Sequence, residues 1–244
     1  MAPMSTETVL RDKLAACTRI FAMQHLMGLF GHISVCDPAA GRVYFSPSMG
    51  VDKATVSPDQ ILVSDPAGKV LDGERRLPIE WPIHTELHAR RPDALAVAHL
   101  HAPFATLYSI TRREFRPVTL QGSVFGDGVP VYGEPRLVKT PDQGAALAQV
   151  IGDRRGAFMR GHGIVVVGCD VEEMLYGALI LEDEARKSVQ AAALGEFDCL
   201  SHADCAAFGA AAEFPARSQR AWSYYANLEK RWDRQPGTGL APFA

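Results

Sequence analysis

The sequence lacks any ordered cysteine pattern. Its five cysteines are scattered, odd in number and contain no Cys-x-x-Cys pair: Cys17, Cys36, Cys169, Cys199 and Cys205. Scattered cysteines of this kind predict neither a disulfide framework nor a thiolate zinc site. We therefore expect a protein of the reducing cytoplasm.

Other features are missing as well. The formal net charge is only −3, with 22% charged residues, which gives no electrostatic reason to expect nucleic acid or an anionic membrane as a partner. No apolar run approaches the roughly 20 residues of a membrane span, and the N-terminus has no signal-peptide pattern. We find no internal repeat and no low-complexity linker. A small-molecule partner is the remaining expectation.

Hydrophobic periodicity predicts alternating helices and hairpins over one domain, residues 1–244. Helical spacing covers 6–28, 82–90, 103–110, 140–149 and 171–194, with a helical C-terminal tail; strand-like runs cover 33–36, 42–45, 61–64, 69–71, 94–98, 157–160 and 164–168, and 122–130 reads as a glycine-rich loop. This order predicts an α/β fold around one mixed or antiparallel sheet.

The most informative motif is His99-Leu100-His101, at the end of a short apolar strand. Side chains alternate along a strand, so the two imidazoles point the same way, about 6.5–7 Å apart at Cα, while Leu100 faces the core. Two imidazoles at this spacing can converge on one metal ion. The alternative is a pair of hydrogen-bonded histidines at a strand end.

His162 lies between Gly161 and Gly163, where two strand-like runs meet. Alone, Gly-His-Gly is more typical of a turn. Together with His99 and His101 it completes three metal ligands with an open coordination position, which is typical of catalytic rather than structural sites.

Glu80 lies immediately before the helix that leads into the His-x-His strand. It can be a favourable acid at a helix N-terminus, or a carboxylate ligand or general acid/base beside the metal. His84 and His88 follow on the same helical face. They could form a competing His-x-x-x-His zinc site, but the amphipathic pattern favours a packed or solvated face.

Two loop segments could contact a substrate. His32 opens a strand after Gly31, and Ser48 and Gly50 lie in the small-residue loop 46–50. Either segment could present backbone N–H groups to an anion, or could be ordinary turn structure.

Taken together, these motifs resemble the class II aldolase/adducin family. Gly31-His32-Ile33-Ser34, Ser46-Pro47-Ser48-Met49-Gly50, Glu80, His99-Leu100-His101 and the run from Arg160 to Gly168 occur in the family's order and spacing, and the resemblance covers roughly residues 8 to 195. It implies a three-layer α/β/α sandwich around a mostly antiparallel central sheet. It also implies a divalent metal on His99, His101 and His162 with Glu80 as acid/base, and a homotetramer with active sites between subunits.

Departures from the sugar-phosphate members indicate the substrate. Those members usually carry Gly-Asn where this chain has Gly31-His32, and Ser-Ser where it has Pro78-Ile79. Pro78 and Ile79 offer no side-chain hydrogen bond to a phosphate. The pattern is more similar to the branch that includes hydroxy-methylpyridine-dicarboxylate and dihydroxyphthalate decarboxylases.

We therefore expect a metal-dependent carbon–carbon lyase, a decarboxylase of an ortho-hydroxylated benzoate, phthalate or pyridine carboxylic acid. The ion (Zn, Mn, Fe or Co) would stabilise an enolate-like electron pair, and Glu80 would deliver or relay the proton. His32, Ser48 and Gly50 would contact substrate, with Tyr224 or Tyr225 reaching a neighbouring site. A metal-dependent aldolase acting on a hydroxy-carbonyl compound or sugar phosphate is the main alternative. An adducin-type scaffold and a mononuclear iron oxygenase are the others.

Overall fold

A computed structural model describes residues 4–48, 50–73, 75–208 and 210–232. Its centre is an eight-stranded sheet in the order β4-β3-β2-β1-β5-β8-β7-β6. Every neighbouring pair is antiparallel except β6 and β7. The strands are β1 (His32–Asp37), β2 (Arg42–Phe45), β3 (Leu62–Ser64), β4 (Val70–Asp72), β5 (Ala96–Leu100), β6 (Val131–Tyr132), β7 (Gly156–Met159) and β8 (Gly163–Gly168).

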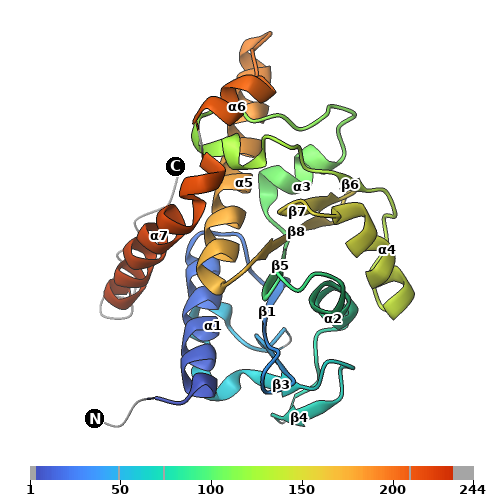
Figure 1. The fold of residues 1–244 in the computed structure, drawn as a ribbon, viewed down its shortest axis with the longest axis vertical. Coiled ribbons are helices and arrows are strands. Elements are labelled where there is room, and N and C mark those ends of the chain that lie inside the picture. Colours follow the sequence, from blue (N-terminus) through green and yellow to red (C-terminus); the bar gives the residue numbers. More distant parts are fainter. Residues whose placement is uncertain (1–3, 49, 74, 209, 233–244) are drawn as a thin grey trace.

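Helices cover both faces of this sheet (Figure 1). One face carries α1 (Thr6–Met23), α3 (Pro103–Ser109) and α5 (Val171–Leu194), with α7 (Ala210–Trp232) packed outside α1 and α5. The other face carries α2 (Trp81–Arg90) and α4 (Pro141–Ile151), which pack against each other. The predicted three-layer α/β/α sandwich around a mostly antiparallel sheet is confirmed.

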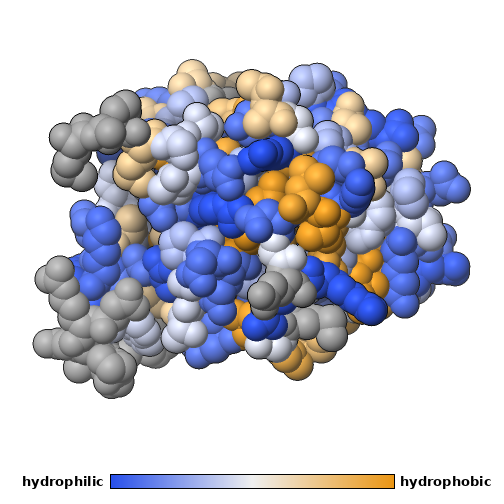
Figure 2. All heavy atoms as spheres, turned by 90° about the horizontal axis from the view of Figure 1, so that it is seen from below, coloured by the Kyte–Doolittle hydropathy of each residue, from blue (hydrophilic) through white to orange (hydrophobic). Residues whose placement is uncertain are grey.

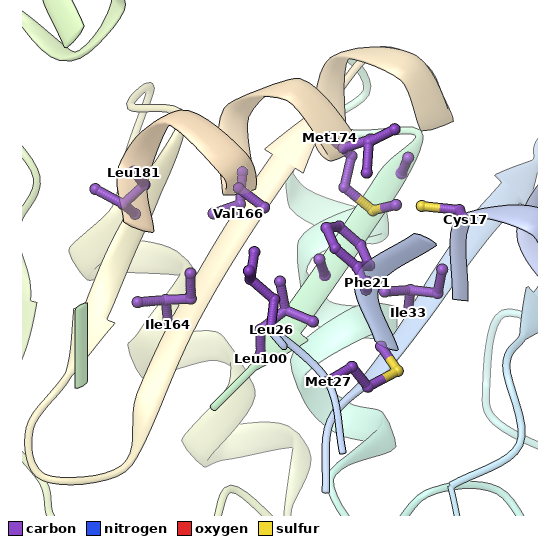
Figure 3. Packing of buried hydrophobic residues seen from close by; sticks show 14 of the residues in the cluster. Cys17, Phe21, Leu26, Met27, Ile33, Leu100, Ile164, Val166, Met174 and Leu181 are labelled. Carbon is purple, nitrogen blue, oxygen red and sulfur yellow. The ribbon is translucent and has the colours of Figure 1, made fainter. Parts of the chain in front are cut away.

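Strand β5 lies between the two largest of three apolar clusters. Ala96, Ala98 and Leu100 face the larger core beneath α1 and α5, whereas Val97 faces the smaller core beneath α2 and α4. Figure 3 shows the larger core, where side chains from α1, β1, β5, β8 and α5 meet. By alternation His99 shares the face of Val97, and Leu100 faces the core as predicted.

Side-chain caps mark the starts of some helices. The Ser5 hydroxyl accepts from the N–H of Thr8 and caps α1, and Thr140 forms a capping box with Gln143 at the start of α4. The predicted range of α5 is confirmed at both ends.

Two predictions of secondary structure were wrong, and two short elements were not predicted. The first helix ends at Met23 rather than residue 28, because His25 has the left-handed φ of +56° that breaks the helix. The region 122–130 is not purely a loop, since residues 121–125 form a 3-10 helix. Strand β6 and helix α6 (His202–Phe208) were not predicted; two strand residues are too few for a period.

Among the described residues, no helix is long and apolar enough to cross a membrane.

Candidate metal centre

The three histidines of the predicted ligand set come together at one end of two paired central strands. His99 is in β5, His101 follows that strand, and His162 precedes β8, whose residue Ile164 pairs with Leu100. The ring centres of the three histidines are 4.8 to 5.0 Å apart. One ligand nitrogen from each ring lies within 4.8 Å of the others. The antiparallel pairing of β5 with β8 therefore brings the distant motifs together.

Glycines allow His162 to take this position. Gly161 has a φ of +65°, in the left-handed region where a side chain is strained. A Cβ on Gly163 would lie 2.3 Å from the carbonyl oxygen of Leu100, so only glycine permits this approach of β8 to β5. The Gly-His-Gly motif is thus both a turn and the support of a candidate ligand.

Glu80 precedes α2 and points into the histidine cluster. Its Oε1 accepts a hydrogen bond from the N–H of Val138 at 2.9 Å, and its Oε2 lies 3.4 Å from Nε2 of both His99 and His162. Burial acts to raise the pKa of Glu80, but the contacts with His162 and His99 outweigh it, and the net effect lowers the pKa. Glu80 is the N-cap residue of α2 but makes no side-chain capping hydrogen bond, so its carboxylate lies at the helix N-terminus and also faces the histidines.

The chemistry of the cluster fits a divalent ion. Within the described part of the chain, Nε2 of His99 and both ring nitrogens of His162 are buried without a hydrogen-bond partner. Nδ1 of His99 lies 3.1 Å from the carbonyl oxygen of Ile164; it must donate to that acceptor, so a neutral ring has a lone pair at Nε2. Burial, followed by the neighbouring His99 and His162, lowers the pKa of His101 to about 4. Neutral imidazoles with unpartnered nitrogens are the ligands that zinc and related ions take.

His32 lies beside this cluster. It is directly opposite His99 in the β1–β5 register, and one of its ring nitrogens lies within 4.8 Å of ligand atoms of Glu80 and His99. Burial lowers the pKa of His32 well below 6.5. His32 is therefore a neutral group within reach of anything bound at the centre.

His84 and His88 form a hydrogen-bonded chain behind His32 rather than a second metal site. Nε2 of His84 lies 2.7 Å from Nδ1 of His32, and the hydroxyl of Ser34 lies 2.7 Å from Nδ1 of His84 and 2.8 Å from Nε2 of His88. Nδ1 of His88 lies 2.7 Å from the carbonyl oxygen of Ala94. The helical face that carries His84 and His88 is packed against β1, one of the two outcomes that the amphipathic pattern favoured. Nothing in the sequence singled out Ser34, because its role depends on strand β1 lying under α2.

The loop 46–50 leaves the sheet next to His32. Ser46 accepts at Oγ from the N–H of Ile33 at 3.0 Å, which ties the loop to β1. Ser48 is partly buried and Gly50 is exposed with a φ of +66°, while Met49 lies outside the described residues. The buried Lys53 donates to the carbonyl of Pro47.

One further aromatic residue, Phe30, contacts the cluster, whereas the predicted Tyr224 lies elsewhere in this structure. Phe30 is 62% exposed and stacks on His101, with ring centres 5.5 Å apart. The sequence analysis did not single it out, although its position two residues before His32 was a signal. Tyr224 is 60% exposed on α7, against the face opposite to His99, and its ring contacts Tyr225. Its predicted reach into a neighbouring site stays a prediction.

Curated relatives of this chain include several decarboxylases. A 3,4-dihydroxyphthalate decarboxylase from Rhodococcus jostii is 31% identical over 197 residues, covering 76% of this chain and 81% of the relative. Decarboxylase NovR from Streptomyces niveus is 28% identical over 172 residues, 69% of this chain and 64% of the relative. A 4-hydroxy-3-prenylphenylpyruvate oxygenase/4-hydroxy-3-prenylbenzoate synthase from Streptomyces roseochromogenus is 32% identical over 144 residues. That match covers 58% of this chain and about half (52%) of the relative.

Solved structures show the same fold. The L-fuculose 1-phosphate aldolase of Glaciozyma antarctica superposes with a TM-score of 0.81 at 19% identity, covering 96% of this chain and 95% of that chain. An aldolase II superfamily protein of Pseudomonas syringae gives 0.82 at 20% identity, with 98% of each chain covered. The family profile described as Class II Aldolase and Adducin N-terminal domain matches residues 12–189, which include every residue of the histidine and glutamate cluster. The chain therefore belongs to the class II aldolase and adducin family.

Proposed function

We propose that this protein is a divalent-metal-dependent decarboxylase of an ortho-hydroxylated aromatic carboxylic acid. The observation that carries the proposal is the convergence of His99, His101 and His162 around Glu80, with imidazole nitrogens left unpartnered. The decarboxylases among the curated relatives, one of them named for a dihydroxyphthalate, support the substrate class.

The three histidines would hold the ion, which would supply Lewis-acid stabilisation of the electron pair left by carbon–carbon cleavage. Glu80 is a carboxylate that takes a proton from solvent and delivers it to the ring carbon bearing the carboxyl group. The bond from that carbon to the carboxyl group breaks, CO2 leaves, and its electron pair restores the aromatic ring. One proton is consumed in each turnover.

The mouth of the site favours an aromatic rather than a phosphorylated substrate. Phe30 presents an exposed ring next to His101, and the side chain of Ile79 before Glu80 is exposed and apolar. An aromatic acid can stack on Phe30, whereas a phosphate would find no side-chain donor on Ile79 or Pro78. Ser48 and Gly50, in the loop beside His32, remain proposed substrate contacts.

Two other reactions have specific support. Aldolases share the fold, and one curated relative carries an oxygenase name, so aldol cleavage and oxygenation by an iron-loaded site are the competing outcomes.

We further propose a homotetramer whose active sites lie between subunits, with Tyr224 contributed by a second copy. Exposed apolar side chains support an interface: Leu29 beside Phe30 is 76% exposed. On the face seen from below Figure 1, apolar side chains gather in a patch among hydrophilic ones (Figure 2). All five cysteines are free, which supports a cytoplasmic location.

The test is a parallel assay on protein loaded separately with Zn, Mn, Fe or Co. CO2 release is measured from hydroxybenzoates, hydroxyphthalates and hydroxypyridine carboxylates, beside aldehyde release from sugar phosphates and oxygen consumption. Metal-dependent CO2 release without oxygen uptake is expected. Aldehyde release or oxygen uptake alone would replace the proposed reaction with one of the alternatives.

A further inference from the structure

A hydrogen-bonded chain runs from a main-chain carbonyl to the candidate site, through His88, Ser34, His84 and His32. Each link is 2.7 or 2.8 Å long. Ser34 and His84 are fully buried, and His32 is 5% exposed. This hydrogen-bonded chain is therefore shielded from water over most of its length. The positions of its hydrogens are then set by which atoms along it can donate and which can only accept.

The donor-to-acceptor direction of these hydrogen bonds is set at Ala94, the end farthest from the candidate site. The carbonyl oxygen of Ala94 can only accept, so Nδ1 of His88 carries a hydrogen, and in a neutral ring Nε2 is then an acceptor. Ser34 must donate its single hydroxyl hydrogen to that nitrogen. Its oxygen then accepts from Nδ1 of His84, which leaves Nε2 of His84 as an acceptor.

The last link determines the state of His32. Because Nε2 of His84 is an acceptor, Nδ1 of His32 must donate to it. A neutral His32 is thereby left with a lone pair at Nε2. Among the described residues no other group hydrogen-bonds to that nitrogen.

The reverse arrangement, with donors and acceptors exchanged along the hydrogen-bonded chain, is unfavourable. It would require His88 to carry a hydrogen on both nitrogens, and so a positive charge, while its two partners are a hydroxyl and a carbonyl rather than a carboxylate. Burial lowers the pKa of His88 to about 4, which keeps the ring neutral near pH 7.

We propose that Ser34, His84 and His88 are positioning residues that fix His32 as the Nδ1–H tautomer, so that its Nε2 accepts a hydrogen bond from the substrate's hydroxyl group. A carboxylate or phenolate is itself only an acceptor and cannot pair with this nitrogen. The expected role of His32 thus narrows from an anion contact to the recognition of a protonated hydroxyl. The substrate part of this inference rests on the proposed function, but the tautomer does not.

The tautomer can be read directly from long-range 1H–15N correlation spectra of protein labelled with 15N-histidine. The signals are assigned from the single variants His32→Gln, His84→Gln and His88→Gln. We expect all three rings to show the Nδ1–H pattern in the unaltered protein. A hydrogen on Nε2 of His32 would overturn the proposal.

Two variants interrupt the chain. Ser34→Ala removes the hydroxyl, and His88→Phe removes the anchored ring; in each, His84 and His32 should lose their single tautomer. In Ser34→Ala, His88 should keep its tautomer, because Ala94 still holds it. The matched control is Ser64→Ala, a buried serine of the same sheet whose hydroxyl donates to the carbonyl of Asp65. An unchanged His32 pattern in both chain variants would refute the positioning role.

The substrate part is tested by calorimetric binding of 2-hydroxybenzoate and 2-methoxybenzoate to the metal-loaded protein. A preference of about tenfold for the hydroxyl compound is expected from one hydrogen bond, and it should fall in Ser34→Ala but not in Ser64→Ala. Equal affinities, or binding of neither probe, would overturn the assignment of a hydroxyl to His32 while leaving the tautomer result intact. CO2 release, measured separately, tests the proposed reaction.

Discussion

His32 and His99 are register partners across β1 and β5, and their rings lie 5.1 Å apart. The sheet itself thus places His32, which lies outside the predicted ligand set, against a candidate ligand imidazole. The two rings have different supports, since His99 bonds a main-chain carbonyl and His32 bonds His84. One pairing in the sheet therefore joins the candidate metal ligands to the hydrogen-bonded chain behind them.

Replacing Glu80 with Gln should lower decarboxylation by about 10²–10⁴-fold, because the amide cannot carry the proton. Metal content, measured by plasma mass spectrometry, should not change, since the three histidines remain. The control is Glu86→Gln on the same helix, where the carboxylate pairs with Arg90. Full activity of Glu80→Gln would remove the proposed acid/base role.

Replacing His162 with Ala should weaken metal binding more than tenfold, because removing even a supporting neighbour of a metal ligand costs about 10–100-fold. Equilibrium dialysis with Zn or Mn measures the effect. His202→Ala, an exposed histidine of α6, is the control and should bind the ion normally. Unchanged binding by His162→Ala would show that His162 is not a ligand.

Replacing Gly163 with Ala should destabilise the fold by about 1–3 kcal/mol or more, because the new methyl group would overlap the carbonyl of Leu100. Thermal unfolding measures this. Gly133→Ala is the matched control, since a Cβ there meets nothing within 4 Å. A Gly163→Ala melting temperature equal to that of the control would contradict the described strand contact.

Acid should destabilise the protein through His88. Its pKa is about 4 in the fold against 6.5 when unfolded, so between these values only the unfolded chain binds the proton. The contribution of His88 to the free energy of unfolding is therefore fully present above pH 6.5. It is lost as the pH falls towards 4, which lowers stability by about 3 kcal/mol. Urea unfolding at pH 7 and pH 4.5 should show a smaller loss in His88→Gln. Equal losses in both proteins would contradict the shift.

Lys53 should have a corresponding effect at alkaline pH. Burial lowers its pKa from 10.5 to about 8, so between these values the unfolded chain holds a proton that the folded chain has released. Stability should rise as the pH increases from 8 to 10.5, by about 3 kcal/mol. Lys53→Met should remove this rise. Parallel stability profiles for the two proteins would show that Lys53 is not shifted.

Much of the fold around the candidate metal centre was predictable from local sequence. The alternation in β5 placed His99 and Leu100 on opposite faces, and Gly161 and Gly163 marked the turn that carries His162. These signals lie within a few neighbouring residues, where backbone geometry alone decides the outcome.

The remainder depends on pairings between distant segments. Ser34 looked like an ordinary strand residue, because its contacts with His84 and His88 require α2 to lie across β1. The packing of Phe30 on His101 likewise depends on the approach of two segments. No periodicity in the sequence encodes such contacts.

The position of the candidate ligands at the ends of two different strands has a consequence for folding. His101 and His162 come together only when β5 and β8 are paired, so the chain offers them as one chelate only in its native state. An ion that binds the native state alone shifts the folding equilibrium towards it by mass action. The ion would link the ends of β5 and β8 in the middle of the sheet. A chelator would then lower the melting temperature as well as the activity.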